Sequence, residues 1–114
     1  MKKLSQKKLP KKLTAIEKNI NISDLAAAFK ALSNPNRLQL YLDILKKNRT
    51  SFESCEVCFL SDIAVSLKIN PPTISHHLKE LVGADLVITE KRGKQLICKI
   101  NEDTLEQIKK ALPV

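Results

Sequence analysis

The chain has 114 residues, and its formal net charge at pH 7 is +8. This length suits one domain with a modest core, which dimerisation would help to stabilise. No apolar run approaches the roughly 20 residues that cross a bilayer, and no signal-peptide pattern is present. These features predict a cytoplasmic protein without a membrane segment. Three cysteines in that compartment indicate thiols, metal ligands or redox sensors rather than a disulfide framework.

The positive charge is concentrated at the N-terminus. Residues 1–12 hold six lysines and no acidic residue, so they carry +6 of the +8, and residues 13–114 carry only +2. We predict a basic flexible tail at 1–12 and one folded domain at 13–114. The tail can attract phosphate without sequence preference, and it can equally be a solvated terminus with no partner.

Apolar residues at helical spacing predict three helices in the first half of the chain. They are expected at 13–20, 23–32 and 35–47. Ser23 is the expected cap of the second helix and Asn34 that of the third. The third helix is apolar on most sides and is therefore the expected central helix. A polar connection at 48–59 follows and carries Cys55 and Cys58.

The stretch 61–82 has the pattern of two short helices joined by a tight turn. Ser61 is expected to cap the first helix. Asn70 is expected to cap the second, which Pro71 and Pro72 open. The expected buried stripe of the second helix is Ile74, Leu78, Leu81 and Val82.

The other side of that second helix is polar and places small hydrogen-bonding residues near its N-terminus. At about 100° per residue it presents Thr73, Ser75, His76 and Lys79, with His77 on its flank. In a helix-turn-helix, this part of the recognition helix contacts base edges and phosphates in the major groove. We therefore predict that these five residues bind double-stranded DNA. A solvated helix in an ordinary bundle is the alternative.

Two strands are expected after the helix pair, at 86–90 and 95–100, joined by Lys91, Arg92, Gly93 and Lys94. Gly93 supplies the backbone freedom of a hairpin, and the three cations predict a wing that lies against the DNA backbone. Asn101 is expected to cap a last helix, whose acidic first turn and basic last turn complement its dipole. The predicted fold is mainly α (α+β): a winged helix-turn-helix with about five helices and a two-stranded β-wing. We therefore predict that residues 13–114 form a winged helix domain for DNA binding and dimerisation.

Three stretches of the chain resemble the ArsR/SmtB family of metal- and arsenic-responsive winged helix-turn-helix transcriptional repressors. They are FKALSNPNRL at 29–38, NPPTISHHLK at 70–79, and LVGADLV at 81–87 together with RGK at 92–94. The resemblance implies a homodimeric repressor on a near-palindromic DNA operator, with its affinity lowered by an inducer. It also implies a structural or phosphate-contacting role for Arg37.

The candidate sensor site is Cys55 with Cys58. Family members that detect As(III), Cd(II) or Pb(II) often carry Cys-x-Cys where this chain has Phe59 and Ser61, and the zinc and nickel class uses histidines on the last helix, which this chain lacks. Two thiols at the spacing of Cys55 and Cys58 can chelate a soft ion or close a disulfide. As(III), Cd(II) and Zn(II) are therefore candidate inducers, with Cys98 as a further candidate ligand, and a thiol-oxidising signal is the other option.

The cysteines also have interpretations that involve no sensing. Cys98 can be a small core residue and the two loop thiols can be inert, which would leave a winged-helix regulator without metal or thiol sensing, or a protein-interaction module. We do not expect an enzyme or a required cofactor. His76 and His77 lie on a polar helical face, and the sequence has no cleft-forming pattern and no glycine-rich phosphate loop.

Overall fold

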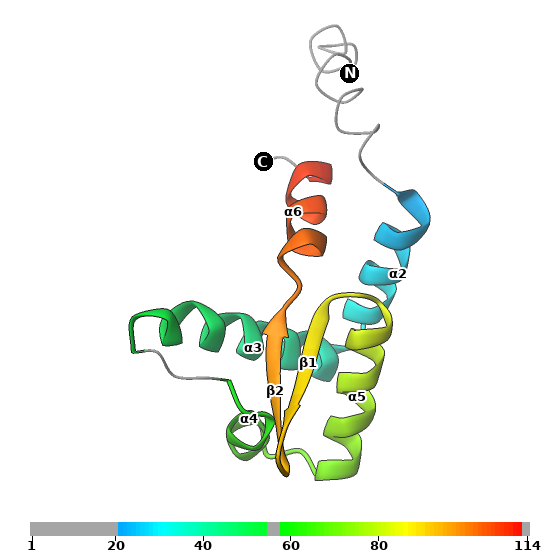
Figure 1. Ribbon diagram of the computed structural model, residues 1–114. Helices are drawn as coiled ribbons and strands as arrows, with labels where there is room; N and C mark the ends of the chain where they lie inside the picture. Colours follow the sequence, from blue (N-terminus) through cyan, green and yellow to red (C-terminus); the bar gives the residue numbers. More distant parts are fainter. Residues whose placement is uncertain (1–20, 55–57, 113–114) are drawn as a thin grey trace, which may run out of the picture.

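The computed structural model describes residues 21–54 and 58–112. In this part of the chain the elements are α2 (Ile22–Leu32), α3 (Pro35–Ser54), α4 (Leu60–Leu67), α5 (Pro71–Gly83), β1 (Val87–Arg92), β2 (Gln95–Ile100) and α6 (Glu102–Ala111). Helix α3 crosses the middle of the molecule, with α2 and α6 toward one end and α4, the start of α5 and the hairpin tip toward the other (Figure 1). This architecture confirms the predicted winged helix-turn-helix. The predicted helix at 13–20 and the tail at 1–12 lie outside the described residues.

Asparagine side chains cap four of the five described helices, α2, α3, α5 and α6. Asn21 caps α2 by accepting a hydrogen bond from the backbone N of Asp24 at 3.0 Å, so the predicted cap Ser23 is wrong by two residues. Asn34 caps α3 as predicted, through the backbone N of Arg37 at 3.1 Å. Asn101 caps α6 as predicted, through the backbone N of Asp103 at 3.1 Å. These caps satisfy backbone donors that have no partner inside the helix.

Helix α3 continues to Ser54, well past the predicted end at Lys47. The extra turns are attached to the distant C-terminal part of the chain. The side-chain amide of Asn48 donates to the backbone O of Cys98 at 3.2 Å and accepts from the backbone N of Ile100 at 3.0 Å. Arg49 forms two hydrogen bonds with the carboxylate of Glu102, at 2.9 and 3.1 Å. No local sequence signal encodes these contacts, so the polar composition of this stretch was misleading.

The two strands form an antiparallel hairpin whose register runs from Val87 opposite Ile100 to Arg92 opposite Gln95. Gly93 adopts a φ of +65° in the two-residue turn, a conformation that glycine reaches without strain. On the outer edge of β2, Phe59 forms an isolated bridge with Ile97, and the backbone N of Cys98 donates to the O of Cys58 at 2.8 Å. This pairing fixes where α4 begins. Phe59 is its N-cap without a side-chain hydrogen bond, so the predicted cap Ser61 is wrong.

The core lies between α3, α5 and the sheet. Its most deeply buried large side chains are Leu40 and Ile44 of α3, Ile74 and Leu81 of α5, and Leu86, Val87, Ile97 and Cys98 near and within the strands. Helix α3 contacts α2, α4, α5 and β2, which fits its predicted central place, although Leu38 and Leu42 on its outer side stay exposed. No helix in the described ranges is long and apolar enough to cross a membrane.

Candidate nucleic-acid interface

The two helices of the motif are joined by a short reversal. Helix α4 ends at Lys68, which adopts a left-handed conformation with φ of 57° and donates its backbone N–H to the O of Ala64. Asn70 then caps α5 by accepting a hydrogen bond from the backbone N of Thr73 at 3.1 Å. Pro71 and Pro72 occupy the first turn, where missing N–H groups cost nothing. The start of α5 is therefore the one that the sequence predicts.

The buried side of α5 differs from the prediction by a small rotation about the helix axis. It consists of Ile74, His77, Leu78 and Leu81. Val82, which was expected in the stripe, is 36% exposed, and His77, which was expected to contact DNA, is only 7% exposed. Both sets form an equally narrow stripe at helical spacing, so periodicity alone does not distinguish them and the packing of α5 decides. Because His77 is buried, it does not lie on the exposed face from which we predicted that it would contact DNA directly.

The exposed side of α5 carries the remaining predicted contacts. Ser75, His76 and Lys79 are exposed, and Thr73 is half-buried. A groove of about 490 Å³ separates this side from the hairpin, and it is lined by Pro72, Ser75, His76, Lys79, Thr89 and Leu96 among others. Hydroxyl, imidazole and ammonium groups thus stand along one wall of an open groove. Such groups can donate to phosphate oxygens and to base edges.

The hairpin carries three exposed cations at its end, Lys91, Arg92 and Lys94. Glu90 pairs with the guanidinium of Arg92 and with the ammonium of Lys99, each at 3.2 Å. Hydrogen bonds from Lys99 and then from Arg92 hold the pKa of the Glu90 carboxyl below its usual value. Among the described residues no ion pair involves Lys91 or Lys94. The positive charge of the tip therefore comes mainly from these two lysines.

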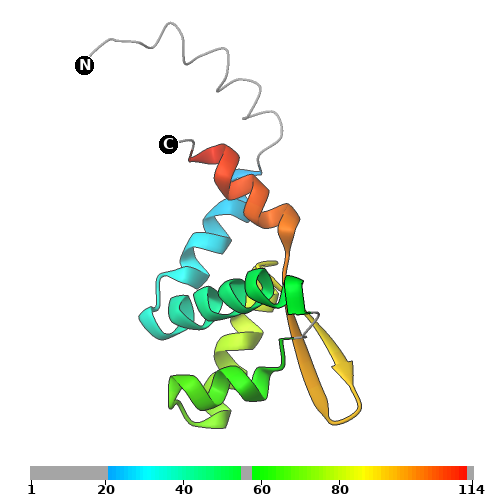
Figure 2. The ribbon, with the colours of Figure 1, turned by 90° about the vertical axis from the view of Figure 1, so that its left-hand side faces the viewer.

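The hairpin tip and the start of α5 lie at the same end of the molecule (Figures 1 and 2). A second hollow, of about 390 Å³, is lined by Lys94 and Gln95 from the hairpin and by Ser61, Pro71 and Ser75 from the two motif helices. One elongated ligand can therefore contact the wing and the recognition helix together. Duplex DNA has this shape, and its phosphates would meet the lysines.

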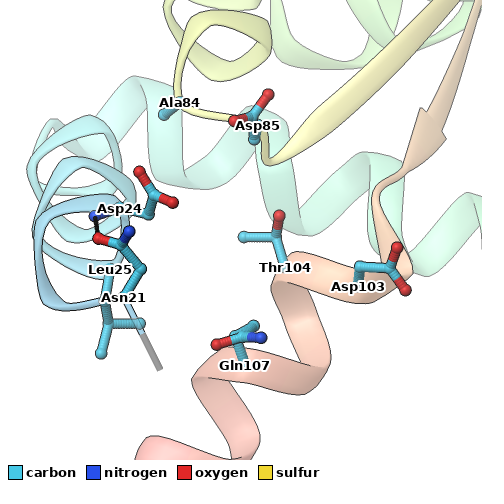
Figure 3. A pocket seen from close by; sticks show the side chains of 8 residues that line it. All are labelled: Asn21, Asp24, Leu25, Ala84, Asp85, Asp103, Thr104 and Gln107. Atoms are coloured by element: carbon cyan, nitrogen blue, oxygen red, sulfur yellow. Dashed lines mark hydrogen bonds between the residues drawn. The ribbon is translucent and has the colours of Figure 1, made fainter. Parts of the chain in front are cut away.

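A pocket at the opposite end of the molecule is acidic. It has a volume of about 220 Å³ and lies between α2, the end of α5 and α6, and its lining includes Asp24, Asp85 and Asp103. Figure 3 shows Asp24 from α2 and Thr104 from α6 reaching into the space between these helices. Carboxylates repel phosphate, so this pocket is unsuited to a nucleic acid. The hollow beside Lys94 at the hairpin tip suits phosphate better.

The predicted cysteine ligands have different positions. Cys55 lies outside the described residues. Cys58, expected in a polar loop, is instead buried at 3% exposure, because its chain pairs with β2. Cys98 is fully buried in the core. Burial raises the pKa of the Cys58 thiol to about 11 and that of Cys98 to about 12, where Cys58 contributes as a second cause. Both thiols are free.

These two cysteines face one another on adjacent strands. The bridge between Phe59 and Ile97 places Cys58 directly opposite Cys98, and residues that are opposite on antiparallel strands project to the same side of the sheet. Cys98, the further candidate ligand, is thus the neighbour of Cys58, and the role of either thiol as a metal ligand stays a prediction. Within the described ranges, no group of three or more His, Cys, Asp or Glu side chains can hold a metal ion.

Two polar residues, for which the sequence predicted no specific contact, help to position the helix-turn-helix. Arg37 in the first turn of α3 donates from Nη1 to the backbone O of Ala31 at 3.2 Å and so joins α3 to the end of α2. Asn48 joins the far end of α3 to β2. The family resemblance indicated Arg37, whereas no pattern in the sequence indicated Asn48.

A helix-turn-helix followed by a basic hairpin, with an exposed polar face at the start of its second helix, defines a winged helix-turn-helix DNA-binding protein. Residues 34–89 match the sequence profile of the bacterial regulatory proteins of the arsR family. The chain is also 32% identical over 95 residues to an arsenical resistance operon repressor of Staphylococcus xylosus, an alignment that covers 83% of each protein. It is 32% identical over 89 residues to the protein of the same name in Staphylococcus aureus, covering 78% of this chain and 77% of that relative.

A solved structure shows the same fold. The homodimeric winged helix-turn-helix DNA-binding domain of a possible ArsR-family regulator from Mycobacterium bovis superimposes with a TM-score of 0.60. The alignment has 22% identity and covers 93% of this chain and 82% of that domain. Together with the two relatives, this shows that the chain belongs to the arsR family. It is a transcriptional regulator with a winged helix DNA-binding domain, and not an enzyme.

Proposed function

We propose that the protein is a homodimeric repressor that inserts α5 into the major groove of a near-palindromic DNA operator and lays its hairpin on the sugar–phosphate backbone. The observation that carries this proposal is the position of Ser75, His76 and Lys79. They are exposed near the start of a helix whose other side is packed into the core. A recognition helix needs this combination, because the buried side holds the exposed side at a fixed angle to the duplex.

The dimer is supported by exposed apolar residues at the end of the molecule that holds the acidic pocket. Ile22 at the start of α2 is 70% exposed, and Leu112 at the end of α6 is 54% exposed. Both helix ends lie far from the hairpin tip (Figure 1). An isologous interface there would leave both recognition helices free, and two-fold symmetry would match two half-sites about 34–36 Å apart.

The test of DNA binding is fluorescence anisotropy with the DNA upstream of the protein's own gene, at two salt concentrations. We expect Ser75→Ala with His76→Ala to abolish sequence-specific binding, because both side chains lie on the proposed contact face. Lys79→Ala should weaken binding to all sequences and reduce the salt dependence by about one phosphate contact. Lys110→Ala, at an exposed lysine of α6, is the matched control and should bind like the wild type. Unchanged specific binding by the double variant would refute the proposal.

The test of the dimer is sedimentation of the Ile22→Lys and Leu112→Lys variants. An added charge in an apolar interface should shift the protein toward monomer and weaken operator binding cooperatively. Val65→Lys is the control, because Val65 is 79% exposed on α4 at the other end of the molecule. A monomeric wild type would contradict the proposal.

We also propose that an inducer lowers operator affinity at Cys55 and Cys58: a soft metal ion, a metalloid such as As(III), or a thiol oxidant. The names of the two staphylococcal relatives support a metalloid. The position of Cys58 supports a direct effect on the motif, because its backbone pairs with β2 immediately before α4 begins. A ligand on this thiol would displace α4 relative to the wing.

The alternative is a regulator without thiol sensing, which the burial of Cys58 favours. Titration of the protein–DNA complex with As(III), Cd(II), Zn(II) and a peroxide separates the two. Release of DNA from the wild type, but not from Cys55→Ser or Cys58→Ser, would establish the sensor. Equal release from all three proteins, or release from none, would establish the alternative. Cys98→Ala shows whether the facing thiol takes part.

A further inference from the structure

Among the described residues, three buried side-chain polar atoms have no hydrogen-bond partner: Nε of Arg37, the hydroxyl of Tyr41 and Nδ1 of His77. Arg37 lies on α3 and His77 on the recognition helix α5, and the charge of Arg37 acts on His77. The Nε of arginine can only donate, whereas Nδ1 of a neutral histidine can accept when the proton is on Nε2. Buried donors and acceptors are nearly always paired in folded proteins, because leaving one unpaired costs free energy. The two atoms are therefore chemically complementary.

The packing of the helices brings these side chains to the same region. His77 is on the side of α5 that faces the core, and α3 is the helix with which α5 makes most of its helix contacts. Arg37 is anchored by its hydrogen bond to Ala31, and it lines a hollow of about 660 Å³ together with Lys79 and Glu80 of α5. Arg37 therefore borders α5 across this hollow, and its charge is near enough to His77 to lower the pKa of that imidazole.

We propose that neutral His77 accepts a hydrogen bond at Nδ1 from Nε of Arg37, directly or through one water molecule, and that this contact positions the recognition helix for operator binding. The inference rests on the proposed function, since it explains how the exposed face of α5 is held at its angle. His77 is a positioning residue in this account. It affects DNA binding only by fixing the positions of Ser75, His76 and Lys79.

The contact depends on the protonation of His77. Burial lowers the pKa of His77, as does the charge of Arg37 and, more weakly, that of His76. Lys79 and Glu80 border the hollow from α5, and Lys30 borders it from α2. Protonation would occupy the acceptor atom and place a second cation beside the guanidinium. Because the pKa of His77 is lower in the packed state than in a loosened one, acid favours the loosened state. The stabilisation of the packed state is fully present above the ordinary histidine pKa of about 6.5, and it declines as the pH falls from there through the lowered pKa of His77.

The experiment compares wild type, His77→Gln and His77→Leu as full-length dimers. Glutamine keeps an acceptor and cannot be protonated, whereas leucine fills similar space without an acceptor. At pH 7.5, we expect His77→Gln to bind operator within about twofold of wild type and His77→Leu to bind about tenfold more weakly. Between pH 7.5 and 5.5, wild type should lose affinity relative to His77→Gln. Equal affinities of all three proteins at every pH would overturn the inference and leave the proposed repressor intact.

Nitrogen-15 chemical shifts of the His77 ring in the DNA-free protein give a second test that does not require an operator. We expect the Nε2–H tautomer with a hydrogen-bonded Nδ1, and we expect Arg37→Met to raise the pKa of His77. Arg37→Lys, which retains the charge but not Nε, should change the Nδ1 shift and leave the pKa closer to that of wild type. An Nδ1–H tautomer, or an Nδ1 shift unaffected by either variant, would overturn the contact even if no operator is found.

Discussion

Asn48 of α3 accepts a hydrogen bond at Oδ1 from the backbone N of Ile100 at 3.0 Å. Its Nδ2 donates to the backbone O of Cys98 at 3.2 Å, so one side chain satisfies two backbone groups on the outer edge of β2. The next pairing on the same edge is the hydrogen bond from Cys98 to Cys58. Helix α3 and the chain before α4 therefore both pair with the outer edge of β2. This covers backbone groups that could otherwise pair with another chain and cause aggregation.

Replacing Asn48 by alanine should destabilise the protein by about 1–3 kcal/mol, because a backbone donor and a backbone acceptor lose their partner in a half-buried place. Urea denaturation followed by circular dichroism measures the change. Asn48→Asp is the informative companion, since it keeps the acceptor for Ile100 and loses the donor to Cys98. A free energy of unfolding for Asn48→Ala within error of the wild type would show that the edge is held by other contacts.

The two glycines of the chain should respond to alanine with opposite signs. Gly93 has φ of +65°, and a Cβ there meets no atom within 4 Å, so the cost is purely conformational. We expect Gly93→Ala to lower the free energy of unfolding by about 1–2 kcal/mol. Gly83 is in the last turn of α5, does not have a left-handed φ, and has equally open space. Gly83→Ala should therefore be stabilising, by up to about 1 kcal/mol. The same thermal or urea unfolding experiment measures both, and equal effects would contradict the assigned turn.

The negative charge of Glu90 should weaken the electrostatic attraction between the hairpin and DNA. Its carboxylate is paired with Arg92 and Lys99, and these hydrogen bonds hold its pKa below the usual value. Glu90 therefore stays charged at all pH values above its ordinary pKa. Glu90→Gln should tighten binding to operator and to unrelated DNA alike, and should steepen the salt dependence by about one charge. Glu106→Gln, on α6, is the control and should change neither. Anisotropy titrations at several salt concentrations measure the slope, and an unchanged slope would place the hairpin away from the DNA.

The two described thiols should be protected from alkylation in the folded protein. Burial raises their pKa values to about 11 and about 12, so at pH 8 roughly one Cys58 in a thousand is a thiolate. We expect iodoacetamide to modify Cys58 and Cys98 far more slowly than in denaturant, and we expect the rate to rise about tenfold per pH unit until the protein unfolds. Mass spectrometry of digested samples resolves each cysteine. If thiol reagents release the protein from DNA as proposed, the release should also become faster as the pH rises, because the thiolate fraction increases. Rapid modification of Cys58 at neutral pH would contradict the burial of its thiol.

The local chemistry of the chain was sufficient for much of the fold. Asn34, Asn70 and Asn101 each cap the helix that their sequence context indicates, because a cap interacts with backbone only three residues away. Two prolines open α5, and a glycine turns the hairpin at the predicted place. The exposure of Ser75, His76 and Lys79 also followed from helical periodicity. These features depend on short separations along the chain, which a sequence displays directly.

Tertiary contacts decided the remainder. Pairing with β2 set the start of α4 and carried Cys58 into the core, and Asn48 with Arg49 held α3 in extra turns across a separation of about fifty residues. The choice between His77 and Val82 for the inner side of α5 was also tertiary. A small rotation of the helix decides it, and the packing of α5 against α3, α2 and β1 selects that rotation. The sequence by itself therefore determined which helix presents the exposed polar face and where that helix begins. The packing against α3 and β2 determined which side chains hold it there, because those partners are distant in the chain and adjacent only after folding.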